Sequence, residues 1–523
     1  VPAPAPAPAA KIDVVASPPP PGHKAPNVAL YKAAAGGQPA FPDYAIVANC
    51  VLQVTNINNN NNKFYSLELH KGIGNCAKPF RLYTHYGRTD DLTTKGHDSG
   101  QKEIRYYDCL DDAKAGYLKI YKDKTSTKKG YKPVNLVSSK IGSTKARDQA
   151  AGTLGAATQA KMASPVSAPS INDGAKGKGK AKRRRKLQPE IAQLVQDLYA
   201  EAKDTLTSTA DVTITANGIE TPLGILSLEQ VEEGENVLKE IAKELKKKRK
   251  SSKKLEELSG DFYTTIPTKI GRTKDQIKDA VIDTVAAVAE KQDLCQLMRD
   301  MLQVMATDAG ALVGDGGVEA QYAALGCTLQ PVPPESEEHR AVMERIEESV
   351  QRSHGQLDLL RGGGGGPVRA VYRARRAEEE ARFTARVTKN QQLLFHGSRA
   401  CNFVGLLSRG ILLPKIVVSL GVTRTDGGWL GDGIYFGDFD TSLNYTSSSS
   451  KGIKYMLVNL VALGRMKDFS NITYGLQKPP KGYDSCHGNP EAEEGSEFED
   501  HEYVVYQEDQ QKVQYLLELN DEI

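Results

Sequence analysis

Short runs of β-branched, aromatic and other apolar residues begin near residue 41 and recur until about residue 140. Gly, Asn and Asp separate these runs, and such punctuation is typical of antiparallel strands joined by turns. The runs that we expect to form strands are 44–52, 63–69, 80–83 and 116–121. Residues 56–62 form an Asn-rich insert, which we expect at the tip of a hairpin. The pattern predicts a small, mainly antiparallel β domain over residues 41–140.

The apolar positions take the period of a helix between residue 187 and about residue 312. Pro189 stands where a first-turn proline is favoured, and Ser227 and Gln230 have the spacing of a capping box. The positions at helical spacing are Ile191, Leu194, Val195 and Leu198, then Leu238, Ile241 and Leu245, then Ile277, Val281, Val285 and Val288, followed by Leu294 and Met298. The lysine-rich residues 246–254 suit an exposed helix end or loop. Together these stripes predict an all-α bundle over 187–312.

Helices and strands are mixed in the last part of the chain, residues 313–523. Residues 337–348 have a helical pattern, and the glycine run 362–366 must be a loop. From about residue 386 short strands dominate. Residues 456–463 are apolar enough for a buried strand. The positions that alternate as on a half-buried strand are Val513, Tyr515, Leu517 and Leu519. This part is predicted to be a mixed α+β domain with a β-sheet core.

Two segments lack large apolar residues, and we expect both to be linkers. Residues 1–40 are rich in Pro and Ala, which favours an extended chain, and residues 141–186 are mostly Ala, Ser, Lys and Gly. The second segment ends in a basic run at 176–186 without any acidic residue. Such a run suits nuclear import or contact with a phosphate backbone, and a merely solvated block of charge is the simpler alternative. We favour nuclear import, and keep a cytoplasmic assembly as the alternative location.

Composition narrows the class of protein further. A length of 523 residues suggests roughly three or four domains, and the net charge of +3 does not indicate a partner. The seven cysteines are scattered singly, which argues against a disulfide framework and a structural zinc site and favours a reducing compartment. No stretch approaches the roughly eighteen apolar residues of a membrane span. The chain begins with Val and has no secretory signal, so we expect it to be processed or cut from a longer one.

The last third contains polar and aromatic residues that are unusual for a core but suit a nucleotide site. Each of them alone is more simply explained as a turn residue, a core tyrosine or a strand-edge charge. Their combination is what indicates a site. These residues are His396, Gly397, Ser398, Tyr435, Phe436, Ser442, Tyr445 and Glu502.

The order of these residues resembles the catalytic domain of the poly(ADP-ribose) polymerases, whose active site is a His-Tyr-Glu triad. The resemblance covers about residues 386–519. It rests on His396-Gly397-Ser398, on the Leu-Gly-Asp-Gly-Ile-Tyr-Phe turn at 430–436, on the step from Tyr435 to Ser442-x-x-Tyr445, and on Glu502 followed by Tyr-Val-Val-Tyr. Within the family, residues 412–417 and 421–426 look most like the vault-associated member, which lacks the N-terminal domain described next.

The resemblance implies NAD as the substrate and no metal. Tyr435 and Tyr445 can stack on the cationic nicotinamide ring, while Gly397 and Ser442 can hold its carboxamide. His396 can hydrogen-bond a ribose hydroxyl. Ser398 and Phe436 complete the motifs of this expected NAD site.

We expect Glu502 to take part in the transfer reaction itself and not only in binding NAD. Positive charge builds on the ribose ring as the nicotinamide–ribose bond breaks, and a nearby carboxylate stabilises that charge. The same carboxylate can hold the 2′-hydroxyl and activate an acceptor hydroxyl. Members that attach only a single ADP-ribose commonly carry an apolar residue here, so Glu502 favours chain elongation. His487 would lie in a loop near the acceptor site, either touching substrate or simply solvated.

Two upstream regions resemble other modules of the same family. Tyr86-Gly87-Arg88, with the run 128–136, resembles the WGR domain, with Tyr86 in place of the name-giving tryptophan. That module binds DNA ends, which implies nucleic-acid contacts for Tyr86, Gly87 and Arg88; a strand end with a turn is the alternative. Residues 221–227 and 259–267 resemble the regulatory helical domain, which covers the NAD site until DNA binding loosens it.

The sequence thus predicts a multidomain α+β protein: a WGR-like β domain, an all-α regulatory bundle and a mixed α+β ADP-ribosyltransferase domain. The expected function is NAD-dependent poly-ADP-ribosylation of acceptor proteins, including the enzyme itself, gated by DNA or another nucleic acid and without any membrane association. The alternatives are a mono-ADP-ribosyltransferase and a catalytically weak scaffold in a large assembly.

Overall fold

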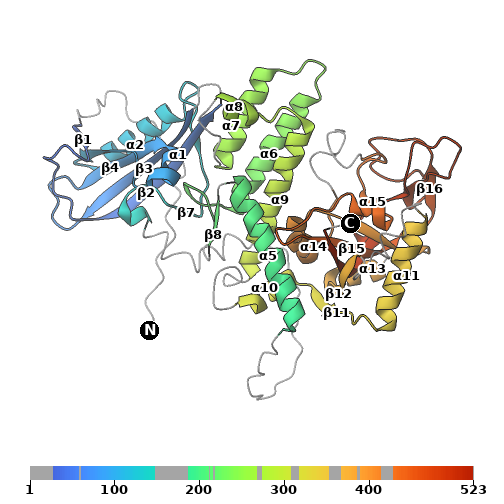
Figure 1. Cartoon of the computed structure of the whole chain (residues 1–523). Helices are drawn as coiled ribbons and strands as arrows, with labels where there is room; N and C mark the ends of the chain where they lie inside the picture. Colours follow the sequence, from blue (N-terminus) through green and yellow to red (C-terminus); the bar gives the residue numbers. More distant parts are fainter. Residues whose placement is uncertain are drawn as a thin grey trace.

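Three bodies follow one another along the chain in the computed structural model (Figure 1). They are a β-sheet domain, a helical bundle in the middle and a second, larger β-sheet domain. The structure describes residues 28–57, 61–147, 187–210, 212–215, 218–267, 274–307, 317–352, 367–385, 389–413 and 428–521. The predicted multidomain α+β architecture is confirmed.

The first body is an antiparallel sheet with two helices packed beside it. Its described strands are β1 (Leu30–Lys32), β2 (Asp43–Asn56), β3 (Asn61–Ile73), β4 (Phe80–Arg88), β5 (Gln101–Tyr107) and β6 (Lys132–Pro133), in the order β1-β5-β4-β3-β2-β6. The helices are α1 (Thr89–Lys95) and α2 (Leu110–Lys124). Asn56 pairs with Asn61 across the β2–β3 hairpin, so the Asn-rich insert lies at a hairpin tip, as predicted.

Two predictions for this region are wrong. Residues 116–121 belong to helix α2, because Ala113 and Tyr117 lie one turn apart and are both buried, and because Cys109 caps the helix by accepting a hydrogen bond from the Asp112 amide. The predicted linker 1–40 contains strand β1, in which Tyr31 pairs with Ile104 of β5. Residues 1–27 and 148–186, with the basic run 176–186, lie outside the described residues.

A small sheet joins the first body to the bundle. Its strands are β7 (Ser138–Ser139), β8 (Thr213–Thr215), β9 (Gly218–Glu220) and β10 (Gly224–Ile225), in the order β7-β10-β9-β8. Gly224 has a φ of +153° and its Cα lies so close to the Ser138 carbonyl that a Cβ would overlap it. Only glycine allows this approach. The stretch 221–227 therefore joins the two bodies through the pairing of β10 with β7.

The helices of the bundle bury the first two predicted stripes completely, together with Val288, Leu294 and Met298 of the third. They are α5 (Pro189–Ala210), α6 (Leu228–Leu245), α7 (Ser252–Thr265), α8 (Lys274–Asp279), α9 (Val285–Thr307) and α10 (Gly317–Leu325). Ser227 caps α6 by accepting from the Gln230 amide, but the second half of the predicted capping box is not formed, because the Gln230 side chain donates to the Thr265 carbonyl instead. The expected continuous stripe from Ile277 to Val288 is interrupted, because α8 ends at Asp279 and α9 begins only at Val285.

The third body is built on a nine-stranded sheet among the described residues. The strands are β11 (Thr328–Pro331), β12 (Val368–Arg375), β13 (Gln391–Gly397), β14 (Ile434–Gly437), β15 (Ile453–Ala462), β16 (Met466–Phe469), β17 (Ser485–Gly488), β18 (Glu502–Val505) and β19 (Gln511–Asn520). Their order is β11-β12-β19-β15-β13-β14-β18-β17-β16. The associated helices are α11 (Glu337–Arg352), α13 (Ala377–Ala385), the 3-10 turn η1 (Ala400–Asn402), α14 (Phe403–Arg409), α15 (Phe439–Leu443) and the 3-10 turn η3 (Glu508–Gln510).

The centre of this sheet is covered on both faces. Strand β15 is buried, as predicted, and the helix expected at 337–348 is α11. The prediction of a half-buried last strand is wrong, because Leu516 and Glu518 of β19 are buried as well as Leu517 and Leu519. The glycine run 362–366 lies outside the described residues.

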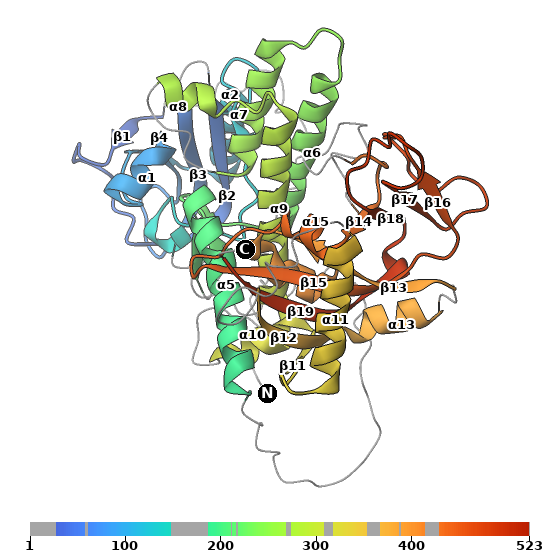
Figure 2. The ribbon, with the colours of Figure 1, turned by 45° about the vertical axis from the view of Figure 1, so that its right-hand side comes forward.

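The bundle and the large sheet share one hydrophobic core. Met301 of α9, Phe403 of α14 and Leu516 of β19 belong to the same buried cluster. A buried ion pair reinforces the junction: Arg409 donates from Nε and Nη2 to the two Asp300 carboxylate oxygens at 2.7 and 3.2 Å. Helix α9 packs on α14, and α5 packs on η1 and β11 of the third body (Figure 2). The bundle is therefore firmly seated on the third body.

Helix α7 approaches strand β2 of the first body closely enough to yield a testable prediction. A Cβ on Gly260 would lie 2.6 Å from the Thr55 carbonyl oxygen, and the Thr55 amide donates to Thr264 Oγ1 at 2.9 Å. Gly260→Ala is therefore expected to cost about 1–3 kcal/mol and to lower the thermal midpoint by a few degrees. Lys253→Ala, on the exposed part of the same helix, is the control. Equal midpoints for the two variants in thermal unfolding would contradict this contact.

Candidate active site

A pocket opens where β13, β14, β18 and α15 meet in the third body. Its space is about 470 Å³, counting the part that is open to solvent. The residues that line it are Phe395, His396, Gly397, Tyr435, Phe436, Gly437, Thr441, Ser442, Tyr445 and Glu502. Seven of the eight residues predicted from sequence are in this group, although they come from β13, β14, α15, β18 and the turn after α15.

His396 is held in one orientation by the neighbouring strand. Its Nδ1 lies 2.9 Å from the Tyr435 carbonyl oxygen. A carbonyl can only accept, so Nδ1 carries the proton. In this tautomer Nε2 is the acceptor, which suits a hydroxyl donor.

Gly397 and the backbone of α15 form the tightest part of the wall. A Cβ at Gly397 would overlap the Ser442 carbonyl oxygen and would also lie 3.3 Å from Thr446 Cγ2. Ser442 is buried on α15, which begins after Asp438. Glycine at 397 is therefore required by space, and it leaves backbone N–H and C=O groups at the wall of the pocket.

The two predicted tyrosines differ in how firmly they are held. The Tyr435 hydroxyl donates to the Gly431 carbonyl at 2.8 Å and accepts from the Leu430 amide at 3.0 Å, so the turn 430–435 fixes its ring. Tyr445 follows α15 and is 42% exposed. An exposed ring at the mouth of a pocket can cover a flat ligand, whereas a fixed ring can form its floor.

Glu502 opens strand β18 and is 8% exposed. Its register partners are Gly437 on β14 and Gly488 on β17, so both neighbouring positions lack a side chain. The Phe498 ring occupies the space at Gly488, while Glu502 and Gly437 both line the pocket. A buried carboxylate in such a pocket can stabilise positive charge that develops on a ligand.

Ser398 is the one predicted residue that does not line the pocket. Its hydroxyl instead accepts a hydrogen bond from the Asn402 side chain at 3.1 Å, at the turn leading into α14. Conversely, Phe395, Gly437 and Thr441 line the pocket and were not predicted. Phe395 and Gly437 are paired across β13 and β14, and only knowledge of that pairing could have identified them.

A histidine pair lies on the opposite face of β18 from Glu502, since alternate residues of a strand face opposite sides. His487 is buried in strand β17, so the prediction of a solvated loop residue is wrong. Its Nδ1 donates to Asp468 at 2.7 Å, and its Nε2 accepts from His501 Nδ1 at 3.0 Å. Tyr503 stacks on His487 at 4.5 Å. These contacts hold the face of β18 that lies opposite Glu502.

The histidine pair predicts a pH dependence of stability. Burial lowers the pKa of both rings from the ordinary value of 6.5, against the opposing attraction of Asp468 for His487 and of Asp438 for His501. A second proton on the His487 ring would place its Nε2–H against the Nδ1–H of His501. The unfolded chain takes up protons near pH 6.5 that the folded pair resists, so the stability is complete above that pH and is lost as the pH falls below it.

We therefore expect His501→Asn to reduce the loss of thermal midpoint between about pH 7.5 and 5.5, because one of these rings can no longer titrate. The charged groups acting on the two rings are Asp438, Arg352, Glu491 and Asp500 for His501, and Asp468 and Arg352 for His487. His339→Asn, on α11, is the control and should retain the full dependence. Parallel midpoint–pH curves for the unaltered chain and His501→Asn would show that the pair is not the titrating element.

The predicted nucleic-acid residues lie at the end of β4 in the first body. The Tyr86 ring stacks on Tyr65 at 5.3 Å, and its hydroxyl donates to Glu103 at 2.9 Å. Gly87 packs against Phe64, and Arg88 pairs with Asp90 at 2.9 Å while remaining 30% exposed. Tyr86 therefore has an internal packing role, and Arg88 is the member of the three that keeps an accessible charge.

Within the described ranges, no helix is both long and apolar enough to cross a membrane. Most of residues 412–417 and all of residues 421–426, which carry the resemblance to the vault-associated member, lie outside those ranges.

Comparisons with known families assign all three bodies. Residues 48–137 match the WGR domain, residues 185–309 the poly(ADP-ribose) polymerase regulatory domain, and residues 336–498 the poly(ADP-ribose) polymerase catalytic domain. The pocket residues up to Tyr445 fall inside the catalytic match, and Glu502 follows it by four positions.

Individual relatives agree with these matches. The chain is similar to human protein mono-ADP-ribosyltransferase PARP4, with 32% identity over 64% of this chain and 18% of the relative. The mouse PARP4 match covers 15% of the relative, so the chain spans less than a fifth of these two proteins. It is also similar to poly [ADP-ribose] polymerase 2 of Arabidopsis thaliana, with 27% identity over 90% of the chain and 73% of the relative. Human protein mono-ADP-ribosyltransferase PARP3 is 25% identical over 92% of the chain and 89% of the relative.

Proposed function

This chain belongs to the poly(ADP-ribose) polymerase family, and we propose that it transfers ADP-ribose from NAD to acceptor proteins, including itself. The observation that carries the proposal is the meeting of His396, Tyr435, Tyr445 and Glu502 on one pocket. A silent scaffold would have no need for a carboxylate that is buried yet flanked by glycines.

NAD is bound by two tyrosine rings and by the pocket wall that Gly397 and Ser442 form. Tyr435, fixed by the turn at 430–435, and the more exposed Tyr445 stack on the nicotinamide ring from its two faces. Gly397 and Ser442 hold the carboxamide by backbone and hydroxyl groups. His396, with its proton on Nδ1, accepts a ribose hydroxyl at Nε2.

The chemical half depends on Glu502. The bond between ribose C1′ and the nicotinamide nitrogen breaks, and nicotinamide leaves with the electron pair. Glu502 stabilises the positive charge on the ribose ring and takes the proton of the acceptor hydroxyl, whose oxygen bonds to C1′. The same step on a ribose hydroxyl of an attached unit lengthens the chain, and we propose poly-ADP-ribose as the product.

A single attached unit is the second candidate product. Human relatives PARP4 and PARP3 carry the name mono-ADP-ribosyltransferase, while the Arabidopsis thaliana relative is named a polymerase. Glu502 supports the polymer, and the length of the product distinguishes the two.

We propose that nucleic acid gates this activity through the WGR domain. The chain of contacts that supports this runs from Thr55 to Thr264 on α7, from α7 through α6 to α9, and from α9 to the catalytic domain through Asp300 and Arg409. A signal that loosens the first contact can thus reach the helix that touches the catalytic domain. The expected nuclear location rests on the basic run 176–186.

Ligand binding and gating can be tested together. Nicotinamide should raise the thermal midpoint of the chain, and Tyr435→Ala should abolish that rise. Blunt DNA ends should increase nicotinamide release from NAD several-fold. If DNA ends leave the rate unchanged while nicotinamide still binds, the site stands and the gating is refuted. If nicotinamide gives no rise at millimolar concentration, the site itself is refuted.

A further inference from the structure

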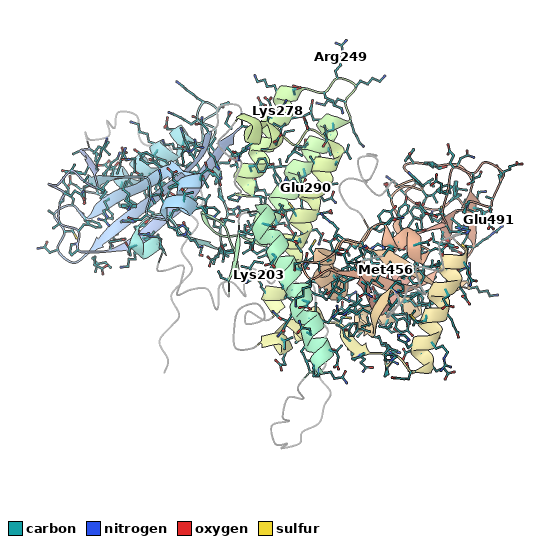
Figure 3. All side chains as sticks on the ribbon, in the orientation of Figure 1. Lys203, Arg249, Lys278, Glu290, Met456 and Glu491 are labelled. Carbon is teal, nitrogen blue, oxygen red and sulfur yellow. The ribbon has the colours of Figure 1, made fainter. Side chains whose placement is uncertain are left out.

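The turn between α6 and α7 carries the densest positive charge of the described residues. Residues 246–254 contain seven Lys or Arg and two Ser, and all nine are exposed. Arg249 points away from the rest of the molecule at the far end of the bundle (Figure 3). We call residues 246–254 the basic tip.

Carboxylates neutralise only a small part of this charge. Lys247 pairs with Glu244 at 2.6 Å and Lys254 with Glu257 at 3.7 Å. Among the ion pairs of the described chain, none includes Lys246, Lys248, Arg249, Lys250 or Lys253. One or two lysines would suffice to complement the C-terminal end of α6, so five further cations exceed that structural need.

The composition of the basic tip indicates the chemistry of its ligand. It has no aromatic or aliphatic side chain to anchor a protein partner or to enter a membrane. Lys and Arg alone neutralise a regular array of phosphates and gain affinity from released counterions. Such a surface suits a phosphodiester backbone.

The position of the basic tip favours nucleic acid as the source of that backbone. Helix α7 begins in the basic tip at Ser252, and Thr264 near its other end contacts Thr55 of the WGR domain. Twelve residues of helix span about 18 Å, the length of roughly five base pairs. A duplex at the WGR domain can therefore extend to the basic tip.

We propose that the basic tip is a second phosphate-binding surface, which contacts the backbone of a duplex held by the WGR domain. This inference rests on the proposed nucleic-acid binding and adds a contact on the regulatory bundle itself. A duplex that contacts both ends of α7 would act directly on the helix that connects the regulatory bundle to the WGR domain.

The test is binding of a labelled blunt 20-base-pair duplex to the full chain, by fluorescence anisotropy across a salt series. The double variant Arg249→Gln/Lys250→Gln should bind roughly tenfold more weakly near 0.1 M salt and reduce the log–log salt slope by about 1.8, or 0.9 per lost phosphate contact. Its matched control is Lys478→Gln/Lys481→Gln, which removes the same charge from an exposed loop of the catalytic domain.

The outcomes separate this inference from the proposed function. If the unaltered chain binds and Arg88→Gln weakens it, but the tip variant matches its control, the basic tip is not a contact and the WGR role survives. If the unaltered chain does not bind the duplex, both ideas fail. If the tip variant loses affinity for purified poly(ADP-ribose) but not for the duplex, the assignment to nucleic acid is overturned.

Discussion

Glu502→Gln is expected to abolish chain elongation while leaving NAD bound. The amide has the shape of the carboxylate but neither its charge nor its ability to take a proton. Loss of one such electrostatic group typically costs about 10²–10³ in rate. Elongation depends on both functions of Glu502, so we expect it to suffer more than attachment of the first unit. Product length on a denaturing gel, with NAD labelled in the adenylate, is the measurement.

Glu518→Gln is a matched control for this change. Both glutamates are 8% exposed and lie on strands of the same sheet, but Glu518 does not line the pocket. Burial raises the pKa of Glu518, so its neutral replacement should be well tolerated. Products of unchanged length from Glu502→Gln would mean that its role is misassigned. If the unaltered chain attaches only single units, the polymer proposal gives way to the mono-transferase.

Gly397→Ala is expected to destroy the NAD pocket. The added Cβ would overlap the Ser442 carbonyl oxygen, which belongs to the backbone of α15 and cannot rotate away. Forcing α15 outward moves Ser442 and Tyr445 together. We expect a loss of stability of at least about 1–3 kcal/mol and no rise of the thermal midpoint with nicotinamide.

Gly437→Ala tests whether this effect is specific to position 397. Gly437 lines the same pocket, but its added Cβ would lie 3.2 Å from Thr441 Cβ and Cγ2, so a shift of a few tenths of an ångström would relieve the contact. This variant should keep most of the nicotinamide-induced rise. Equal responses of the two alanine variants would contradict the close approach on which the pocket wall depends.

The sequence predicted those elements that depend on residues close together in the chain. The Ser227 cap and the buried faces of α5 and α6 depend on residues three or four positions apart, which the sequence displays directly. Strand β1 could not be predicted this way, because its three residues are ordered by pairing with β5, more than seventy positions away. The break before α9 has a signal that was overlooked, since Thr284 Oγ1 accepts from the Ala287 amide as an N-cap.

The candidate site also combines residues that the sequence reveals with residues that only the packing of distant segments brings in. Its named residues could be found because they resemble a family in order and spacing. Thr441 and Phe395 carry no such signal and enter the pocket only through the packing of α15 and β13. The strand at His487 could not be predicted, because four residues, 485–488, are too few to show the alternation of a strand. Its burial arises from the neighbouring strands β16 and β18 and from the stacked Tyr503 ring.

Transfer of ADP-ribose is the central claim, and incubation of the intact chain with labelled NAD and blunt DNA ends tests it most directly. The account predicts covalent label on the chain itself, release of nicotinamide in step with it, and loss of elongated products in Glu502→Gln. Absence of both label and free nicotinamide from a chain that still binds nicotinamide would contradict it, and would leave the fold as a binding module.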